Sequence, residues 1–147
     1  MTNTAPRRLV LGLPWPVLIG LALLGLPRVV LHDLDLVHEG TFVNLLLVVV
    51  PPVVWISVVL ARRVTNPFLT LVVIGLCYGV VLALTHQLLW GVAFDEQPTL
   101  GGNLSDLAPG VQSVIIRFFA AISSIFTGVI VGVVTGLITW GLSRLRA

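Results

Sequence analysis

Long apolar runs alternate with short polar breaks along this chain of 147 residues, and the pattern predicts four helices. The runs cover residues 14–34, 41–61, 67–90 and 113–142. Periodicity cannot separate helix from strand inside a continuous apolar run, but length can: a membrane strand has about 9–11 residues and a membrane helix about 20. The second run would be about 31 Å long as a helix, close to the hydrocarbon thickness of a bilayer. We therefore predict an all-α integral membrane bundle of four transmembrane helices.

Residues that start or stop helices support these boundaries. Pro14 lies where the first helix is expected to begin, and Asn66 followed by Pro67 is typical of an N-cap and a first helical turn. Residues 95–110 are rich in proline and glycine, so an external loop with little regular structure is expected there. Because no repeat or soluble segment interrupts the pattern, residues 1–147 are predicted to form a single membrane domain.

The composition of the chain also indicates that lipid is its main solvent. Hydrophobic residues make up 57% of the chain and charged residues only 10%, and the mean hydropathy is +1.10. Soluble domains carry about 25% charged residues, so this chain lacks the polar side chains needed to cover itself in water. The net charge of +2 comes from basic residues beside apolar runs rather than from a clustered basic face. The expected partner is therefore the lipid bilayer, and a nucleic-acid partner is not expected.

Charges are segregated between the two ends of the predicted spans. Arginine pairs lie in both tails and in the loop between the second and third spans: Arg7, Arg8, Arg62, Arg63, Arg144 and Arg146. All acids and histidines fall at the opposite ends: His32, Asp33, Asp35, His38, Glu39, His86, Asp95, Glu96 and Asp106. Because arginine and lysine accumulate on the cytoplasmic side of membrane proteins, we predict that both termini are cytoplasmic, in a cell (plasma or inner) membrane.

Small residues recur every four positions on two spans. The fourth span carries Ala120, Ser124, Gly128, Gly132 and Gly136, and the third carries Gly75, Gly79 and Ala83. Helices in lipid associate through such stripes because small side chains let the backbones approach closely. This glycine-zipper pattern predicts packing of the third helix on the fourth, with a homo-oligomeric interface or a glycine-lined pore as alternatives.

The second span contains adjacent prolines, Pro51 and Pro52, at its midpoint. Proline removes a backbone donor and clashes with the preceding turn, so a kink or an unwound turn is expected. Broken membrane helices line binding sites in many transporters, whereas other prolines in membrane helices are purely structural. Both interpretations are kept.

A polar stripe is predicted near the end of the first span. Arg28, His32, Asp35 and Glu39 follow an i, i+4, i+7, i+11 spacing, which places all four on one face if the helix continues to Gly40.

The depth of Arg28 in the membrane has two conflicting estimates. Counted from Thr41, it lies about 20 Å below the outer boundary, and counted from Arg8 it lies near the outer surface. A deep arginine would face a protein interior or a water-filled cavity, whereas a shallow one would belong to the wet face of a helix end.

Other polar residues are expected at the same level. His86 lies about 28 Å along the helix from Pro67, and Arg117 enters the fourth span at a similar height. An outer polar vestibule is therefore predicted from Arg28, His32, Asp33, Asp35, His38, Glu39, His86, Gln87 and Arg117.

Four chemical interpretations of this vestibule remain open. The histidines and carboxylates could bind a divalent metal ion, but their spacing matches no metal motif, so no metal site is expected. A His–Asp proton relay is consistent with imidazole titrating near neutrality. Arg28 and Arg117 could hold an anion or a lipid phosphate. Otherwise the residues form a solvated, partly ion-paired rim.

No catalytic or cofactor motif occurs, so neither an enzyme nor a cofactor is predicted. The leading hypothesis is a small membrane protein, forming a homo-oligomer, that binds or conducts a small polar or ionic solute through the vestibule. The alternative is a non-catalytic accessory or assembly subunit that docks its glycine stripes onto a larger membrane complex. An intramembrane enzyme using His86 with Asp33 or Asp35 is the third.

Overall fold

The computed structural model describes residues 11–94 and 96–145. Of these residues, 77% are helical and none lies in a strand. The elements in chain order are α1 (Trp15–Leu23), α2 (Leu26–Asp33), α3 (Phe42–Ala61), α4 (Pro67–Ala93), the 3-10 helix η1 (Gly102–Leu104) and α5 (Pro109–Arg144). Four segments are long and apolar enough to cross a membrane: α1 together with α2, then α3, α4 and α5. The predicted all-α class is confirmed for the described residues.

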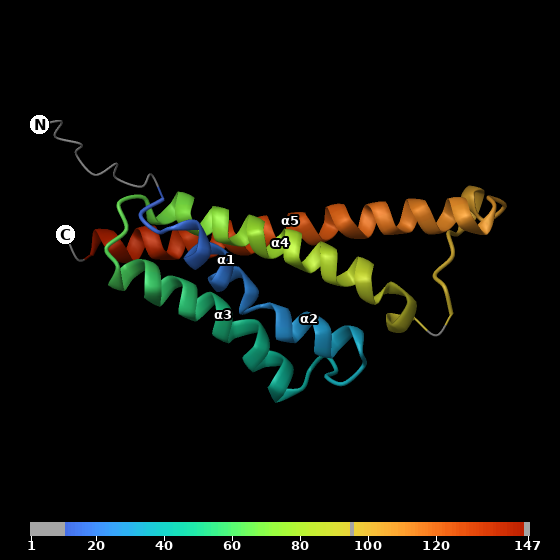
Figure 1. Cartoon of the computed structure of the whole chain (residues 1–147), viewed down its shortest axis with the longest axis horizontal. Helices are drawn as coiled ribbons and strands as arrows, with labels where there is room; N and C mark the ends of the chain where they lie inside the picture. The colour runs from blue at the N-terminus through green and yellow to red at the C-terminus, as the bar shows by residue number, and fades with distance from the viewer. Residues whose placement is uncertain (1–10, 95, 146–147) are drawn as a thin grey trace, which may run out of the picture.

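The helices run back and forth between two chemically different ends of the molecule (Figure 1). The start of α1, the α3–α4 connection and the end of α5 lie at one end, which carries Arg62, Arg63 and Arg144 and is called the arginine end. The ends of α2 and α4 and the start of α3 lie toward the other, the histidine end, with His32 and His86. The segregation of charge along the sequence is therefore a segregation in space.

Helices α4 and α5 pack side by side and form the main structural framework of the fold (Figure 1). Their small-residue stripes face each other, because a Cβ on Gly75 would lie 2.6 Å from the Cα of Gly132, and one on Gly79 would lie 2.8 Å from the Cα of Ile125. The stripe residues Ala83, Ser124, Gly128 and Gly136 are buried as well. Contact this close requires glycine, and the stripes are covered by one another within the chain.

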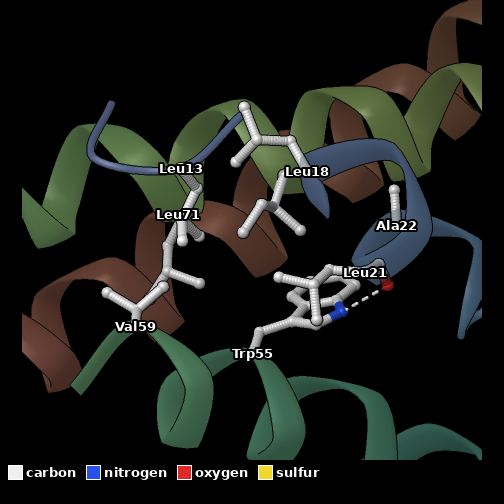
Figure 2. Close-up of a cluster of buried hydrophobic side chains, with 8 residues drawn as sticks. Leu13, Leu18, Leu21, Ala22, Trp55, Val59 and Leu71 are labelled. Atoms are coloured by element: carbon white, nitrogen blue, oxygen red, sulfur yellow. Dashed lines mark hydrogen bonds between the residues drawn. The ribbon is translucent and has the colours of Figure 1, made fainter. Parts of the chain in front are cut away.

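The first span is broken rather than continuous. α1 ends at Leu23 and α2 begins at Leu26, with a turn between them. A Cβ on Gly25 would collide with the edge of the Tyr78 ring, so glycine lets the turn approach α4. The indole Nε1 of Trp55 donates to the Leu21 carbonyl at 2.6 Å (Figure 2). The carbonyl of Leu21, near the break, therefore has a buried hydrogen-bond partner on α3.

The main hydrophobic core lies beside this break (Figure 2). It joins α1 and the segment before it to α3 and α4 through Leu13, Leu18, Leu21, Ala22, Trp55, Val59, Leu71 and Ile74. Long-range contacts between α2 and the other helices at the histidine end are instead partly polar, as described below.

The prediction that one helix face carries Arg28, His32, Asp35 and Glu39 is wrong. α2 ends at Asp33, and Asp35 adopts a left-handed conformation with φ +56°, so the helix cannot continue through it. Gly40, with φ +80°, leads into the N-cap of α3, where the Thr41 hydroxyl accepts a hydrogen bond from the Asn44 amide. Only the first two of the four polar residues share a helix.

The loop expected at residues 95–110 corresponds closely to the connection between Ala93 and Pro109, whose one regular element is η1 among the described residues. α4 continues to Ala93, and α5 starts at Pro109, four residues before the predicted residue 113. The buried Gln112 side chain accepts from the Leu100 amide and donates to the carbonyls of Ser105 and Leu107. One glutamine in the first turn of α5 therefore holds the loop against the helix.

Candidate functional site

Four helices line a partly open cavity of about 270 Å³ near the middle of the bundle, here called the Arg28 cavity. Its lining comes from the α1–α2 turn and α2, from α3, from α4 and from α5: Gly25, Arg28, Leu47, Val48, Pro51, Pro52, Trp55, Tyr78, Thr127 and Val131. The two irregular features of the sequence, the break before α2 and the proline pair of α3, therefore meet at one place.

Arg28 is the only charged residue in this lining. Its Nε donates to the Asn44 side-chain oxygen at 3.2 Å, which ties α2 to the first turn of α3. Among the described residues, no carboxylate oxygen lies within 4.0 Å of the guanidinium. The positive charge is thus positioned by an amide and has no counter-charge from the described chain.

The proline pair brings unpaired acceptors to the same cavity. α3 stays helical through Pro51 and Pro52, so of the two expected outcomes, a kink or an unwound turn, the unwound turn is absent. Proline has no N–H, so the carbonyls of Leu47 and Val48, four residues earlier, lose their usual helical donors. All four residues line the cavity.

Two hydroxyl groups complete the polar lining. Ser124, Thr135 and Thr139 on α5 donate to carbonyls of their own helix. By contrast, the hydroxyls of Tyr78 and Thr127 make no hydrogen bond to any described residue; Thr127 is exposed, and Tyr78 is half-buried without a fully buried unpaired polar atom. These two hydroxyls therefore border accessible space and are available to a solute.

A second polar group, here called the Asp33 cluster, lies at the histidine end and consists of His86, Asp33, His32 and Glu39. The Asp33 side chain is only 5% exposed and contacts His86 Nδ1 at 2.6 Å and His32 Nδ1 at 3.7 Å. His32 Nε2 lies 3.9 Å from Glu39, whose side chain is 80% exposed. The contacts form a line from a buried carboxylate to the surface.

The Asp33 cluster borders its own cavity of about 280 Å³, which Ser123 and Ser124 of α5 also line. Ser123 and Thr127 are four residues apart, so their side chains are neighbours on one face of α5, about 5–6 Å apart. A cavity on the other side of the cluster, of about 430 Å³, reaches Asp35 and Val92. The Arg28 cavity and the cavity beside Asp33 share no lining residue, but Ser123 of one and Thr127 of the other lie one helical turn apart on α5.

The structure divides the predicted vestibule into separate groups. Asp35 and His38 form their own exposed pair, at 3.2 Å. Gln87 donates to the Arg117 carbonyl at 3.1 Å, and the Arg117 guanidinium lies 5.0 Å from the centre of the Trp90 ring, a cation–π contact.

Arg28 lies level with the first turn of α3, and its depth in a membrane stays a prediction. Its partner Asn44 is three residues, or about 4–5 Å, into α3 from Thr41. The cavity that it lines nevertheless reaches the proline pair at the middle of α3.

Sequence reasoning missed three residues of the Arg28 site, namely Asn44, Tyr78 and Thr127. Each is a polar residue within an apolar run, and Tyr78 is the only tyrosine of the chain. That weak signal does not say which helix face each residue occupies.

The described residues contain no group of three or more histidine, cysteine or acidic side chains placed to hold a metal ion. The contacts of the Asp33 cluster run in a line and do not converge on one point. No protein-family model matches this sequence, and no curated protein or solved structure is significantly similar to it.

Proposed function

We propose that this protein is a small multi-pass membrane protein that binds a small polar or ionic solute in the Arg28 cavity and conducts it across the membrane. The observation that carries the proposal is Arg28 itself: a cation without a carboxylate partner in the described chain, held in a cavity between four apolar segments. Charged residues within membrane segments are costly and typically mark solute pathways.

The polar groups at the histidine end supply the entrance in this proposal. A solute would pass the Asp33 cluster and the hydroxyl of Ser123 before it reaches Thr127 and Arg28. Beyond the cavity, the hydrophobic core around Trp55 closes the route to the arginine end. Conduction therefore requires a movement of this core, for which the break before α2 and the proline pair of α3 supply the weak points.

Flux through reconstituted protein tests this function. Proteoliposomes are expected to take up at least one member of a panel of small ions faster than empty vesicles, and Arg28→Gln is expected to lower that flux about tenfold because it removes the charge of the site. Arg62→Gln is the matched control, since Arg62 is exposed at the arginine end and lines none of the three cavities described above. Flux equal to that of empty vesicles for every ion would overturn conduction.

We further propose that the arginine end faces the cytoplasm of a cell whose plasma or inner membrane holds the protein, because arginine pairs accumulate on that side. In a Cys77→Ser background, Gly102→Cys in the α4–α5 loop should react with an impermeant thiol reagent added to intact cells. Thr65→Cys in the α3–α4 connection should react only after lysis. The reverse pattern would invert the orientation.

The two other hypotheses have less support. A docking subunit would need a surface other than the small-residue stripes, which cover each other between α4 and α5. An intramembrane hydrolase would use the Asp33–His86 pair, with Ser123 or Ser124 of the same cavity as nucleophile. Neither serine is hydrogen-bonded to His86, and the Ser124 hydroxyl donates to the Ala120 carbonyl. The site lacks an activated nucleophile among its described residues.

A further inference from the structure

We infer that the solute bound in the Arg28 cavity is a small oxyanion, a carboxylate or a phosphate group held by the guanidinium. The inference rests on the proposed function because it concerns the same cavity. It adds the chemical class of the ligand, which neither the cavity volume nor the apolar character of the helices specifies.

Charge is the first argument. Arg28 is the only charged residue of the lining, and no described carboxylate lies within 4.0 Å of it. A cation entering the cavity would meet uncompensated positive charge, whereas an anion would neutralise it. Because a charge in a low-dielectric environment is costly without a partner, the arginine itself is stabilised by a bound anion.

The available donors are the second argument. Nε of Arg28 is engaged by Asn44, which orients the guanidinium and leaves the terminal Nη groups free of described side-chain partners. The planar fork of arginine matches the oxygens of carboxylate and phosphate in a bidentate geometry. The hydroxyls of Tyr78 and Thr127 add two further donors, whereas the Trp55 N–H is already engaged with Leu21.

Size and acceptors restrict the ligand further. A volume of about 270 Å³ lies below the range of roughly 300–1,000 Å³ that is typical of pockets for drug-sized ligands. At about 30 Å³ per water molecule, the cavity has room for a small oxyanion such as acetate or phosphate together with several waters. The carbonyls of Leu47 and Val48, which lack helical donors, can accept a hydrogen bond from a protonated oxyanion such as hydrogen phosphate.

Two sources supply this chemistry: a free anion that enters from water, or the phosphate of a lipid headgroup that reaches in from the leaflet at the histidine end. To separate them, full-length protein purified in a maltoside detergent is titrated calorimetrically with sodium phosphate and with sodium acetate at constant ionic strength. Phospholipid retained by the same samples is measured by native mass spectrometry, before and after addition of phosphate.

The expected result is saturable binding of phosphate or acetate, or retained phospholipid that phosphate displaces. Arg28→Gln is expected to weaken this binding at least about tenfold, and Thr127→Val about threefold, because each removes donors from the anion. Arg117→Gln is expected to stay within about twofold of the wild type, because Arg117 lies outside the cavity. If Arg28→Gln does not fold, Thr127→Val and Tyr78→Phe carry the test, since neither hydroxyl has a partner among the described residues.

Saturable binding of the free anions identifies water as the source, and displaceable phospholipid identifies the lipid. Absence of both, or binding that the cavity variants leave unchanged, overturns the inference. The flux assay and the binding assay can fail independently of each other. Cation flux without oxyanion binding would retain conduction and reject the oxyanion, whereas oxyanion binding without flux would do the reverse.

Discussion

Gly128→Ala is expected to lower the free energy of unfolding by about 3 kcal/mol, the largest effect of a single methyl group that we expect in this protein. A Cβ at this position would lie 2.5 Å from the Cα of Gly79 and would also meet backbone atoms of Gly75. Backbone atoms cannot rotate away as a flexible side chain can, so α4 and α5 must separate. Separation would also expose the hydroxyl of Thr135 on the same helix face, which is buried in the native fold.

Denaturant unfolding in detergent micelles, followed by circular dichroism, measures this effect. Gly141→Ala is the matched control, because it lies on the same helix and its Cβ would have no atom within 4 Å. That control is expected to be neutral or to stabilise the protein by up to about 1 kcal/mol, since alanine favours helix. Equal stabilities of the two variants would show that the α4–α5 contact is looser than described here.

Asp33→Ala is expected to destabilise the protein by about 2–3 kcal/mol, the second largest effect. The Asp33 carboxylate is buried and lies 2.6 Å from His86 Nδ1, which joins α2 to α4. Its removal leaves a partly buried imidazole without its acceptor. The cost is moderated because the His86 side chain is 32% exposed and can recruit water.

The same unfolding assay tests this prediction against Asp35→Asn, because the Asp35 side chain is 91% exposed in its contact with His38 and asparagine tolerates the left-handed conformation of this residue. That control is expected to change stability by less than about 0.5 kcal/mol. A double-mutant cycle of Asp33→Ala with His86→Ala should give a coupling energy of about 1–2 kcal/mol. Additive effects of the two substitutions would mean that the pair does not hold α2 on α4.

The two predictions concern two different helix contacts of the same bundle. The close α4–α5 contact provides a rigid pair of helices, and the α2–α4 contact at Asp33 fixes the shorter elements at the histidine end of that pair. Arg28 precedes Asp33 within α2, so loss of the Asp33 contact should also loosen the Arg28 cavity. Measuring oxyanion binding in Asp33→Ala would show how far the two sites depend on each other.

Much of the secondary structure could be predicted because it depends on local chemistry. Apolar runs of about 20 residues are stable in lipid only when every backbone polar group is bonded within the segment, which requires a helix. Caps such as Asn66 and the proline after it mark a boundary through their own backbone preferences. The predicted boundaries at residues 41–61 therefore lie within one residue of α3.

The loop after α2 shows where local reasoning fails. The spacing from Arg28 to Glu39 suits a helix, but Asp35 turns left-handed, and the chain reverses there to begin α3. In the same way, the turn before Gly25 interrupts an apolar run without any polar residue to announce it. Its position depends on Tyr78 and Trp55, two side chains contributed by other helices.

The sequence by itself determined the helical class, the number and length of the apolar segments and the separation of most arginines from the acids and histidines. These follow from solvation and backbone hydrogen bonding, which act on each segment independently. Only the tertiary structure decided which polar groups meet. Asp33 and His86 are 53 positions apart, and Arg28 and Asn44 are 16 apart. Such contacts depend on the rotation and relative height of packed helices. Near-uniform apolar faces do not specify that rotation and height. The close approach of glycine backbones and the break at Gly25 specify them once the helices have packed.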